Sequence, residues 1–306
     1  MYRLITSILA AAFALCPSAF AFKTTAQERT QCTRSSTTSP AVLKKNAGAQ
    51  FPFEPTEELI YEGFFTRLLL RSINVAELSF TSERVLPASN VNGVNNQSTD
   101  ANFRFTMDVS SKGIVPRLFG FRFHERVEST IDAASFSVLR TTKLDEQNER
   151  QRTSEAVFDR QARKVVWTER NPKEPQQAPR IVTSNFTSNF DGALQDIVSI
   201  FYFLRTRQLT TGLKFDVPIT DAGQIFGLPV TVLETKKLKT ALGEVATVRV
   251  DVDVFGDGRL LPGDGALSIW FTDDARRIPV QAHVASSMGT IDVKLKSRTL
   301  SPKTIN

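Results

Sequence analysis

The stretch between residues 248 and 254 is the feature that most constrains the fold of this chain. In the segment EVATVRVDVDVF, every second residue from Val248 to Val254 is a valine, and each residue between them carries a charge. Successive side chains of a β-strand point to opposite faces of the sheet. The alternation therefore predicts a strand with one buried face and one face in water.

The remainder of the last third continues in the same manner. The strand-like runs are LKFDVPI, QIFGLPVTVLETKKL, ALSIWF, RIPVQAHV and GTIDVKLKSRTL. Short turn-forming segments, among them TDAG, KTALG and TDDAR, separate them. Strands joined by such short turns pair as antiparallel hairpins. We predict a mainly β fold, either an antiparallel curved sheet or a partly open β-barrel, built from meander hairpins.

One segment, DGALQDIVSIFYFLRTRQLTTG, departs from the strand pattern. Apolar residues recur there at steps of three and four, at Leu194, Ile197, Val198, Phe201 and Leu204. Asp191 is a candidate N-cap and Gly212 a candidate stop, so the spacing predicts one helix over 191–212. Because this helix is apolar on most sides, it must be covered on most sides. We expect it to pack over the mouth or the concave face of the sheet.

The first residues predict export. Arg3 precedes the apolar run LITSILAAAFALC, and Ala19 and Ala21 have the A-x-A spacing of a signal-peptide cleavage site. The run is shorter than the roughly 20 apolar residues of a membrane span. We therefore expect a periplasmic protein, with outer-membrane association or secretion left open. Lipidation at Cys16 is the alternative processing. Cys32 is the only cysteine expected in the mature chain, so no internal disulfide is expected.

The expected organisation has four parts. Residues 1–21 are the predicted signal peptide, and residues 22–50, rich in Thr, Ser, Ala and Gln, are a predicted disordered tether. Residues 51–300 are predicted to form a single large antiparallel β domain, with one or two lobes. Residues 301–306 are a tail.

The chain offers little that favours catalysis or nucleic-acid binding. It has two histidines, His124 and His283, and no G-x-S-x-G or H-E-x-x-H motif and no paired cysteines. The formal net charge is +6, but the basic residues are scattered and form no concentrated stripe. We expect no enzymatic activity, no cofactor, no metal site and no nucleic-acid partner, and at most peripheral contact with a membrane.

Two interpretations of the aromatic and acidic clusters follow. The chain has 23 phenylalanines and three tyrosines, which fits either ordinary core packing or an apolar ligand cavity. The candidate pocket residues are Leu194, Ile197, Phe201, Leu204 and Trp270. In TDDARR, the adjacent Asp273 and Asp274 are interpreted as the tip of a hairpin, because Asp is favoured where its side chain accepts backbone N–H groups.

Several of these motifs together resemble the domain-of-unknown-function 3108 (DUF3108) family over roughly residues 51–298. The matching residues are Glu58, Leu59 and Tyr61 in the opening strand, Gln195, Asp196, Ser199, Tyr202 and Arg205 in the helical segment, and Trp270, Thr272, Asp273, Asp274, Arg276, Arg277 and Pro279 in the final hairpin. Thr56 stands where the family has a glycine. The resemblance implies an exported envelope protein with a mostly antiparallel β fold, and it brings no catalytic residues.

The polar residues of the matched motifs form a candidate structural network: Asp196, Arg205, Asp273, Asp274 and Arg277. Asp196 is expected to pair with Arg277 or Arg205 and so to hold the helix against the hairpin.

Three functions remain open from the sequence. The first is non-enzymatic binding or transport of a hydrophobic or amphipathic envelope molecule such as a lipid, which requires an internal cavity beside Ile197, Phe201 and Leu204. The second is an adaptor that binds an envelope protein, which requires an exposed apolar patch. The third is a hydrolase, which requires His124 or His283 within hydrogen-bond reach of an acid and a hydroxyl group.

Overall fold

The computed structural model describes residues 51–85, 102–113, 120–159, 161–186 and 193–300. These residues form fifteen strands and one helix. In chain order they are β1 (Glu57–Arg67), β2 (Leu70–Val85), β3 (Asn102–Ser111), β4 (Phe123–Asp132), β5 (Ser137–Gln147), β6 (Arg150–Asp159), β7 (Lys164–Arg170), β8 (Arg180–Asn185), β9 (Gln195–Asp196), α3 (Ser199–Thr206), β10 (Lys214–Asp221), β11 (Gln224–Thr240), β12 (Gly243–Val252), β13 (Gly265–Thr272), β14 (Pro279–Ser286) and β15 (Gly289–Leu300).

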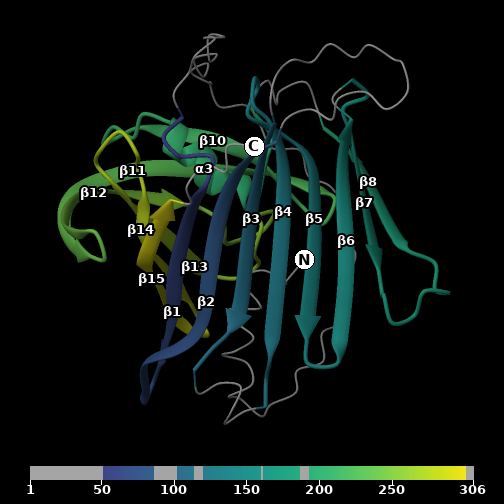
Figure 1. The fold of residues 1–306 in the computed structure, drawn as a ribbon, viewed down its shortest axis with the longest axis horizontal. Helices are drawn as coiled ribbons and strands as arrows, with labels where there is room; N and C mark the ends of the chain where they lie inside the picture. The colour runs from purple at the N-terminus through teal and green to yellow at the C-terminus, as the bar shows by residue number, and fades with distance from the viewer. Residues whose placement is uncertain (1–50, 86–101, 114–119, 160, 187–192, 301–306) are drawn as a thin grey trace.

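All fifteen strands belong to one sheet, in the order β8-β7-β6-β5-β4-β3-β2-β1-β15-β14-β13-β12-β11-β10-β9. Every neighbouring pair is antiparallel except β9 and β10, which are parallel. The order is a meander in each half, and Figure 1 shows β11, β12 and β14 of the second half to the left of β1. The predicted fold class, an antiparallel curved sheet of hairpins with one apolar helix packed over it, is confirmed.

The two meanders are joined by the pairing of β1 with β15. This pairing runs from Glu57 opposite Leu300 to Thr66 opposite Thr290, with one irregularity at Ile60/Tyr61. An extra residue in one strand of a pair bends it and increases its twist. The sheet is therefore continuous across the contact between its first and last strands.

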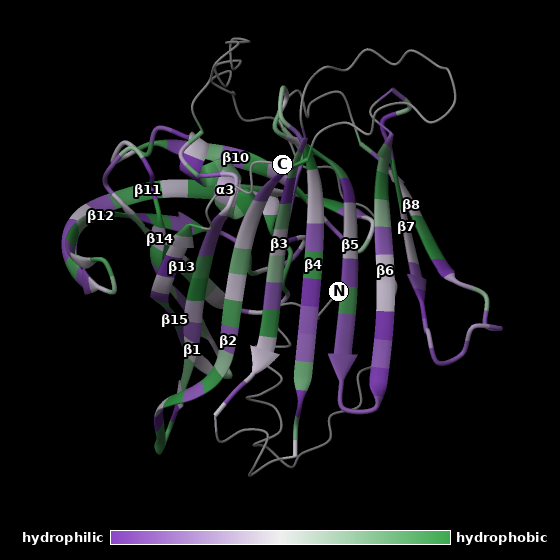
Figure 2. Cartoon of the chain, viewed as in Figure 1, coloured by the Kyte–Doolittle hydropathy of each residue, from purple (hydrophilic) through white to green (hydrophobic). Residues whose placement is uncertain are grey.

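The alternating pattern of the sequence is also the pattern of burial. Val248, Val250, Val252 and Val254 are each at most 3% exposed, whereas the intervening Asp253 lies at the surface. Figure 2 shows the same alternation of hydrophilic and hydrophobic residues along many of the strands. The strand period therefore places one apolar face toward the interior of the curved sheet.

The helix is shorter than predicted. The structure has helix only over Ser199–Thr206, and Gln195 and Asp196 instead pair with Ile219 and Thr220 of β10 as the short strand β9. The predicted N-cap Asp191 lies outside the described residues. Asp196 satisfies backbone donors at the start of the helix, because its Oδ1 accepts hydrogen bonds from the N–H groups of Val198 and Ser199 at 3.1 and 2.8 Å.

The predicted stop at Gly212 was also wrong. The helix ends at Thr206, and Gly212 lies beyond it in a turn with φ +89°. Its backbone N–H donates to the carbonyl oxygen of Val232, 2.9 Å away. The glycine therefore turns the chain into β10 rather than ending α3.

The turn between β10 and β11 packs closely against strands from the opposite end of the chain's sheet order. A Cβ atom at Gly223 would lie 2.8 Å from Cβ of Trp167 in β7 and 3.1 Å from Val182 in β8. Its φ of +77° is also one that glycine adopts without strain. This close contact brings the two ends of the curved sheet together by packing.

The predicted signal peptide (1–21), tether (22–50) and tail (301–306), including Cys16 and Cys32, lie outside the described residues. Within the described ranges, no helix has the length and apolar character needed to cross a membrane.

Candidate functional site

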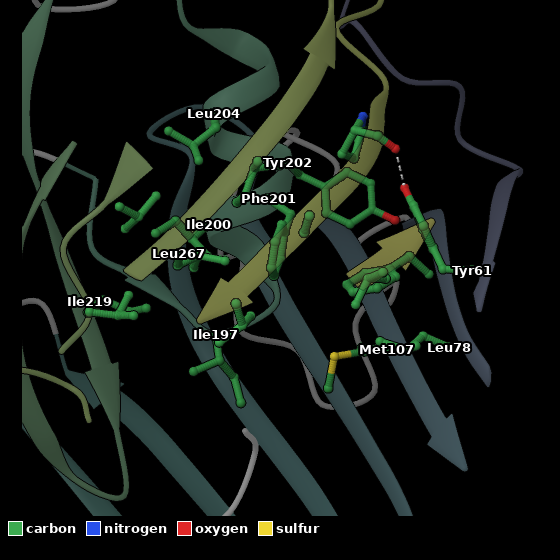
Figure 3. A pocket seen from close by; sticks show the side chains of 18 of the residues that line it. Tyr61, Leu78, Met107, Ile197, Ile200, Phe201, Tyr202, Leu204, Ile219 and Leu267 are labelled. Carbon is green, nitrogen blue, oxygen red and sulfur yellow. Dashed lines mark hydrogen bonds between the residues drawn. The ribbon is translucent and has the colours of Figure 1, made fainter. Parts of the chain in front are cut away.

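An apolar cavity of about 160 Å³ lies inside the curved sheet, next to α3. One wall comes from the first meander, including Leu59, Leu78 and Met107, and the facing wall comes from the second, including Leu267 and Ile269. Figure 3 shows the side chains of α3 projecting into the space between these walls. The lining is almost entirely apolar and the cavity is partly open to solvent.

The cavity contains three of the five predicted pocket residues. Ile197, two residues before α3, lines the cavity, as do Phe201 and Leu204 within the helix. Leu194 does not, because its backbone is held against β5. Its N–H donates to Ser137 Oγ at 3.1 Å, and its carbonyl oxygen accepts the N–H of Val138 at 2.9 Å.

Trp270 is likewise absent from the cavity wall, because it points to the opposite face of β13 from Ile269. Two cations lie over its ring, with Lys236 Nζ 4.7 Å and the guanidinium carbon of Arg249 5.7 Å from the ring centroid. Cations over an aromatic ring are attracted to its negative face. Trp270 therefore holds neighbouring strands together on the outer face and does not contact a ligand in the cavity.

Two tyrosines provide hydroxyl groups at the cavity. The Tyr61 hydroxyl donates to the carbonyl oxygen of Pro279, 2.8 Å away. The Tyr202 ring stacks on Phe105 with ring centroids 3.8 Å apart. Figure 3 shows the two side chains extending toward one another from β1 and α3. Burial raises the pKa of both tyrosines, so both hydroxyls stay protonated.

A buried ion pair anchors α3 beside the cavity. Arg205 and Glu57 are each 1% exposed, and the two Arg205 terminal nitrogens donate to the Glu57 carboxylate. Arg205 also donates to the carbonyl oxygens of Pro52 and Arg276, at 2.9 and 3.1 Å. Arg298 Nε adds a further contact to Glu57, at 2.7 Å. This network ties the helix to β1, to β15 and to the hairpin after β13.

The predicted partner of Asp196 was wrong. Asp196 does not pair with Arg277 or Arg205; its Oδ2 accepts hydrogen bonds from the hydroxyls of Ser129 in β4 and Thr141 in β5. The short strand β9 places the carboxylate there before the helix begins. Asp196 therefore fixes the start of α3 to the first meander, while Arg205 fixes its end.

TDDARR forms the turn between β13 and β14. Asp274 Oδ1 accepts the backbone N–H groups of Arg276 and Arg277 and the hydroxyl of Thr272. Desolvation opposes the charged form, but these donors and the Arg276 guanidinium outweigh it and lower the pKa of Asp274. Asp273 is exposed, and its backbone N–H donates to the carbonyl oxygen of Ala246. This is the geometry of a capped turn.

Arg277 connects the turn to the helix in a different way from the one predicted. Its terminal nitrogen donates to the carbonyl oxygen of Arg205, 3.4 Å away. Its φ is +42°, in the left-handed region. The hairpin and α3 therefore meet through main-chain carbonyls on both sides.

The two histidines pair with carboxylates. His124 lies between Glu146, 2.9 Å away, and Asp108, 3.1 Å away, and His283 Nδ1 lies 2.8 Å from Asp292. Within the described ranges, neither ring makes a hydrogen bond with a hydroxyl group. In the same part of the chain, no group of three or more His, Cys, Asp or Glu residues is arranged to hold a metal ion.

Two features of the site were missed in the sequence. Glu57 was not identified as the partner of Arg205, because the matched motif contains the adjacent Glu58 and not Glu57. The walls from β1 to β3 were missed as well. Their signal was present in EELIYEGFFTR, where Leu59, Tyr61 and Phe65 share one face and are each at most 5% exposed.

The family "Protein of unknown function (DUF3108)" matches residues 81–296, well over half of the chain. The chain belongs to the DUF3108 family. No curated protein matches it. Among solved structures, a beta-barrel-like protein of domain of unknown function DUF1849 from Brucella abortus is 11% identical, with a TM-score of 0.49, and the match covers 81% of this chain and 98% of that chain. A "putative lipoprotein" from Parabacteroides distasonis is 9% identical, with a TM-score of 0.30 and coverage of 81% and 97%.

Proposed function

We propose that this DUF3108 protein is exported to the periplasm and there binds or carries a hydrophobic or amphipathic envelope molecule, without catalysing a reaction. The observation that supports this is the apolar cavity beside Ile197, Phe201 and Leu204. The ligand-binding hypothesis derived from the sequence requires a cavity beside these three residues.

The size of the cavity favours a ligand. An unfilled apolar cavity in a protein costs stability in proportion to its volume, and the volume here is about 160 Å³. An apolar cavity of about 150 Å³ in another protein stays dry and binds a benzene-sized molecule. The space here therefore suits one apolar ring or a short stretch of an acyl chain, with the remainder of the ligand leaving through the open side.

The test fills the cavity from its wall. Ala282 lines the cavity from β14, whereas Ala285 lies on the opposite face of the same strand. We expect A282F to weaken binding of the neutral fluorescent probe N-phenyl-1-naphthylamine by about tenfold or more, because the added ring occupies the ligand's space. A285F is the matched control and should bind as the wild type does. Equal binding by A282F and wild type would contradict the proposal.

A second candidate function, the protein-binding adaptor, is favoured by the tip of the β1–β2 hairpin. Leu68 and Leu69 are 87% and 97% exposed, and the tip is coloured hydrophobic in Figure 2. Leu68 also has φ +48°, a conformation that Gly or Asn adopts more readily. Exposed apolar side chains in a strained turn are typical of contact sites.

A photo-crosslinking residue at position 69, in the exported protein within its host, tests the adaptor. A single discrete adduct with another polypeptide would support it. The same residue placed at the exposed Ile181 is the control. The adaptor is excluded if position 69 gives no more adduct than position 181.

A further inference from the structure

The Tyr202 hydroxyl is a buried hydrogen-bond donor without a partner. Tyr202 is 2% exposed, and its hydroxyl makes no hydrogen bond within the described part of the chain. A buried hydroxyl group that forms no hydrogen bond is unfavourable, and such groups are rare in folded proteins. Tyr202 lines the ligand cavity, so the missing acceptor can come from a bound molecule.

The neighbouring polar groups do not supply that acceptor. The Tyr61 hydroxyl, which Figure 3 shows opposite Tyr202, donates to the Pro279 carbonyl oxygen, and within the described residues its own oxygen does not accept a hydrogen bond from Tyr202. The Glu57 carboxylate accepts from Arg205 and Arg298. The cationic charge of Arg205 is in turn directed at Glu57 and at main-chain carbonyls. Tyr202 is thus left as a neutral donor beside an otherwise apolar space.

We propose that the cavity binds an acyl chain whose carbonyl oxygen accepts a hydrogen bond from the Tyr202 hydroxyl. This inference rests on the proposed function and specifies its ligand class. The apolar walls at Leu59, Ile197 and Ile269 would hold the methylene groups, and the tyrosine would fix the end that carries oxygen. The carbonyl group occurs in a free fatty acid and in an acyl ester, and the site's chemistry is shared by both.

A hydrogen-bonding site discriminates against a ligand that lacks the partner group, because the site's own polar group is then left unpaired. The stacked contact with Phe105 and the edge contacts with Phe53, at 5.3 Å between ring centroids, hold the Tyr202 ring in place. The donor is therefore preorganised, and its contribution to affinity appears as selectivity between ligands of equal length.

The experiment compares three ten-carbon probes, decanoate, methyl decanoate and decane, by their displacement of N-phenyl-1-naphthylamine from the purified mature protein. Each is tested with wild type and with Y202F. We expect Y202F to lose about fivefold in affinity for at least one carbonyl probe and to bind decane as the wild type does. A loss for methyl decanoate indicates an acyl ester, and a loss confined to decanoate indicates a free fatty acid.

Y202F itself should fold, because it removes a hydroxyl group that has no partner and keeps the ring that stacks on Phe105. We expect its apo form to be at least as stable as the wild type in urea. The inference is overturned if Y202F binds all three probes with wild-type affinity, as a bound water on Tyr202 would cause, or if it loses decane equally. If the wild type binds decane without any preference for a carbonyl, only the inference fails. If it binds none of the probes, the proposed function fails as well.

Discussion

Replacing Glu57 should test whether the buried ion pair holds α3 over the cavity. In E57L, Arg205 stays buried at 1% exposure and keeps only the carbonyl oxygens of Pro52 and Arg276 as acceptors. Removing one partner of a buried pair leaves an uncompensated charge and costs about 3–5 kcal/mol of unfolding free energy. We expect E57L to lose about 4 kcal/mol.

The reciprocal change should cost less. In R205M, Glu57 keeps Arg298, whose Nε lies 2.7 Å away, so the carboxylate remains paired and the loss should be about 2 kcal/mol. In the double variant E57L/R205M the fully buried pair is gone, and the only charge that loses its partner is Arg298, whose side chain is 15% exposed. Replacing a buried pair by apolar residues is often close to neutral, and the two carbonyls left without donors cost about 2 kcal/mol.

The assay is urea unfolding of wild type, both single variants and the double variant, followed by tryptophan fluorescence. The reasoning predicts that the double variant is destabilised by at least about 2 kcal/mol less than the sum of the single variants, since contacting residues are not additive. It would be refuted if the two losses simply add. An E57L loss below about 1 kcal/mol would also refute it.

Two further predictions concern the sheet. Desolvation opposes the charged imidazolium of His124, but hydrogen bonds to Glu146 and Asp108 outweigh it and raise the pKa of His124. The stabilisation by the charged His124 is therefore present below about pH 6.5 and is lost as the pH rises through the raised pKa. The difference in melting temperature between wild type and H124Q should shrink over that pH range, and a difference independent of pH would contradict this. G223A should lose about 2–4 kcal/mol in urea unfolding, because φ is +77° and the new Cβ would lie 2.8 Å from Trp167; a loss below about 1 kcal/mol would show that the turn moves freely.

The fold class could be predicted because β-strands show their period locally. The valines from Val248 to Val254 indicate a strand and its buried face without knowledge of any partner. The turns in TDAG and TDDAR limit where neighbouring strands begin and end. The structure places β10 at Lys214–Asp221 and β13 at Gly265–Thr272, close to the predicted runs LKFDVPI and ALSIWF.

The site could be predicted only in part, because its contacts are distant in the sequence. Helical spacing marked Ile197, Phe201 and Leu204, which do line the cavity. The same spacing included Leu194, which the structure places before β9 and against β5. Local periodicity cannot show that β10 pairs with Gln195 and Asp196, since that pairing competes with the first helical turn only once the sheet has formed.

The pairing of β1 with β15 explains why the cavity could not be derived from either half alone. Leu59 and Tyr61 in β1 face inward only because the strand lies between β2 and β15. The Tyr61 hydroxyl then reaches Pro279 of β14, 218 residues away in sequence. Because the two meanders meet at this contact, their apolar faces enclose one space, and α3 is held across it by Asp196 on one meander and by the Arg205–Arg276 carbonyl contact on the other. The ligand cavity is thus a product of the long-range strand order, and it should form only when β15 has paired with β1.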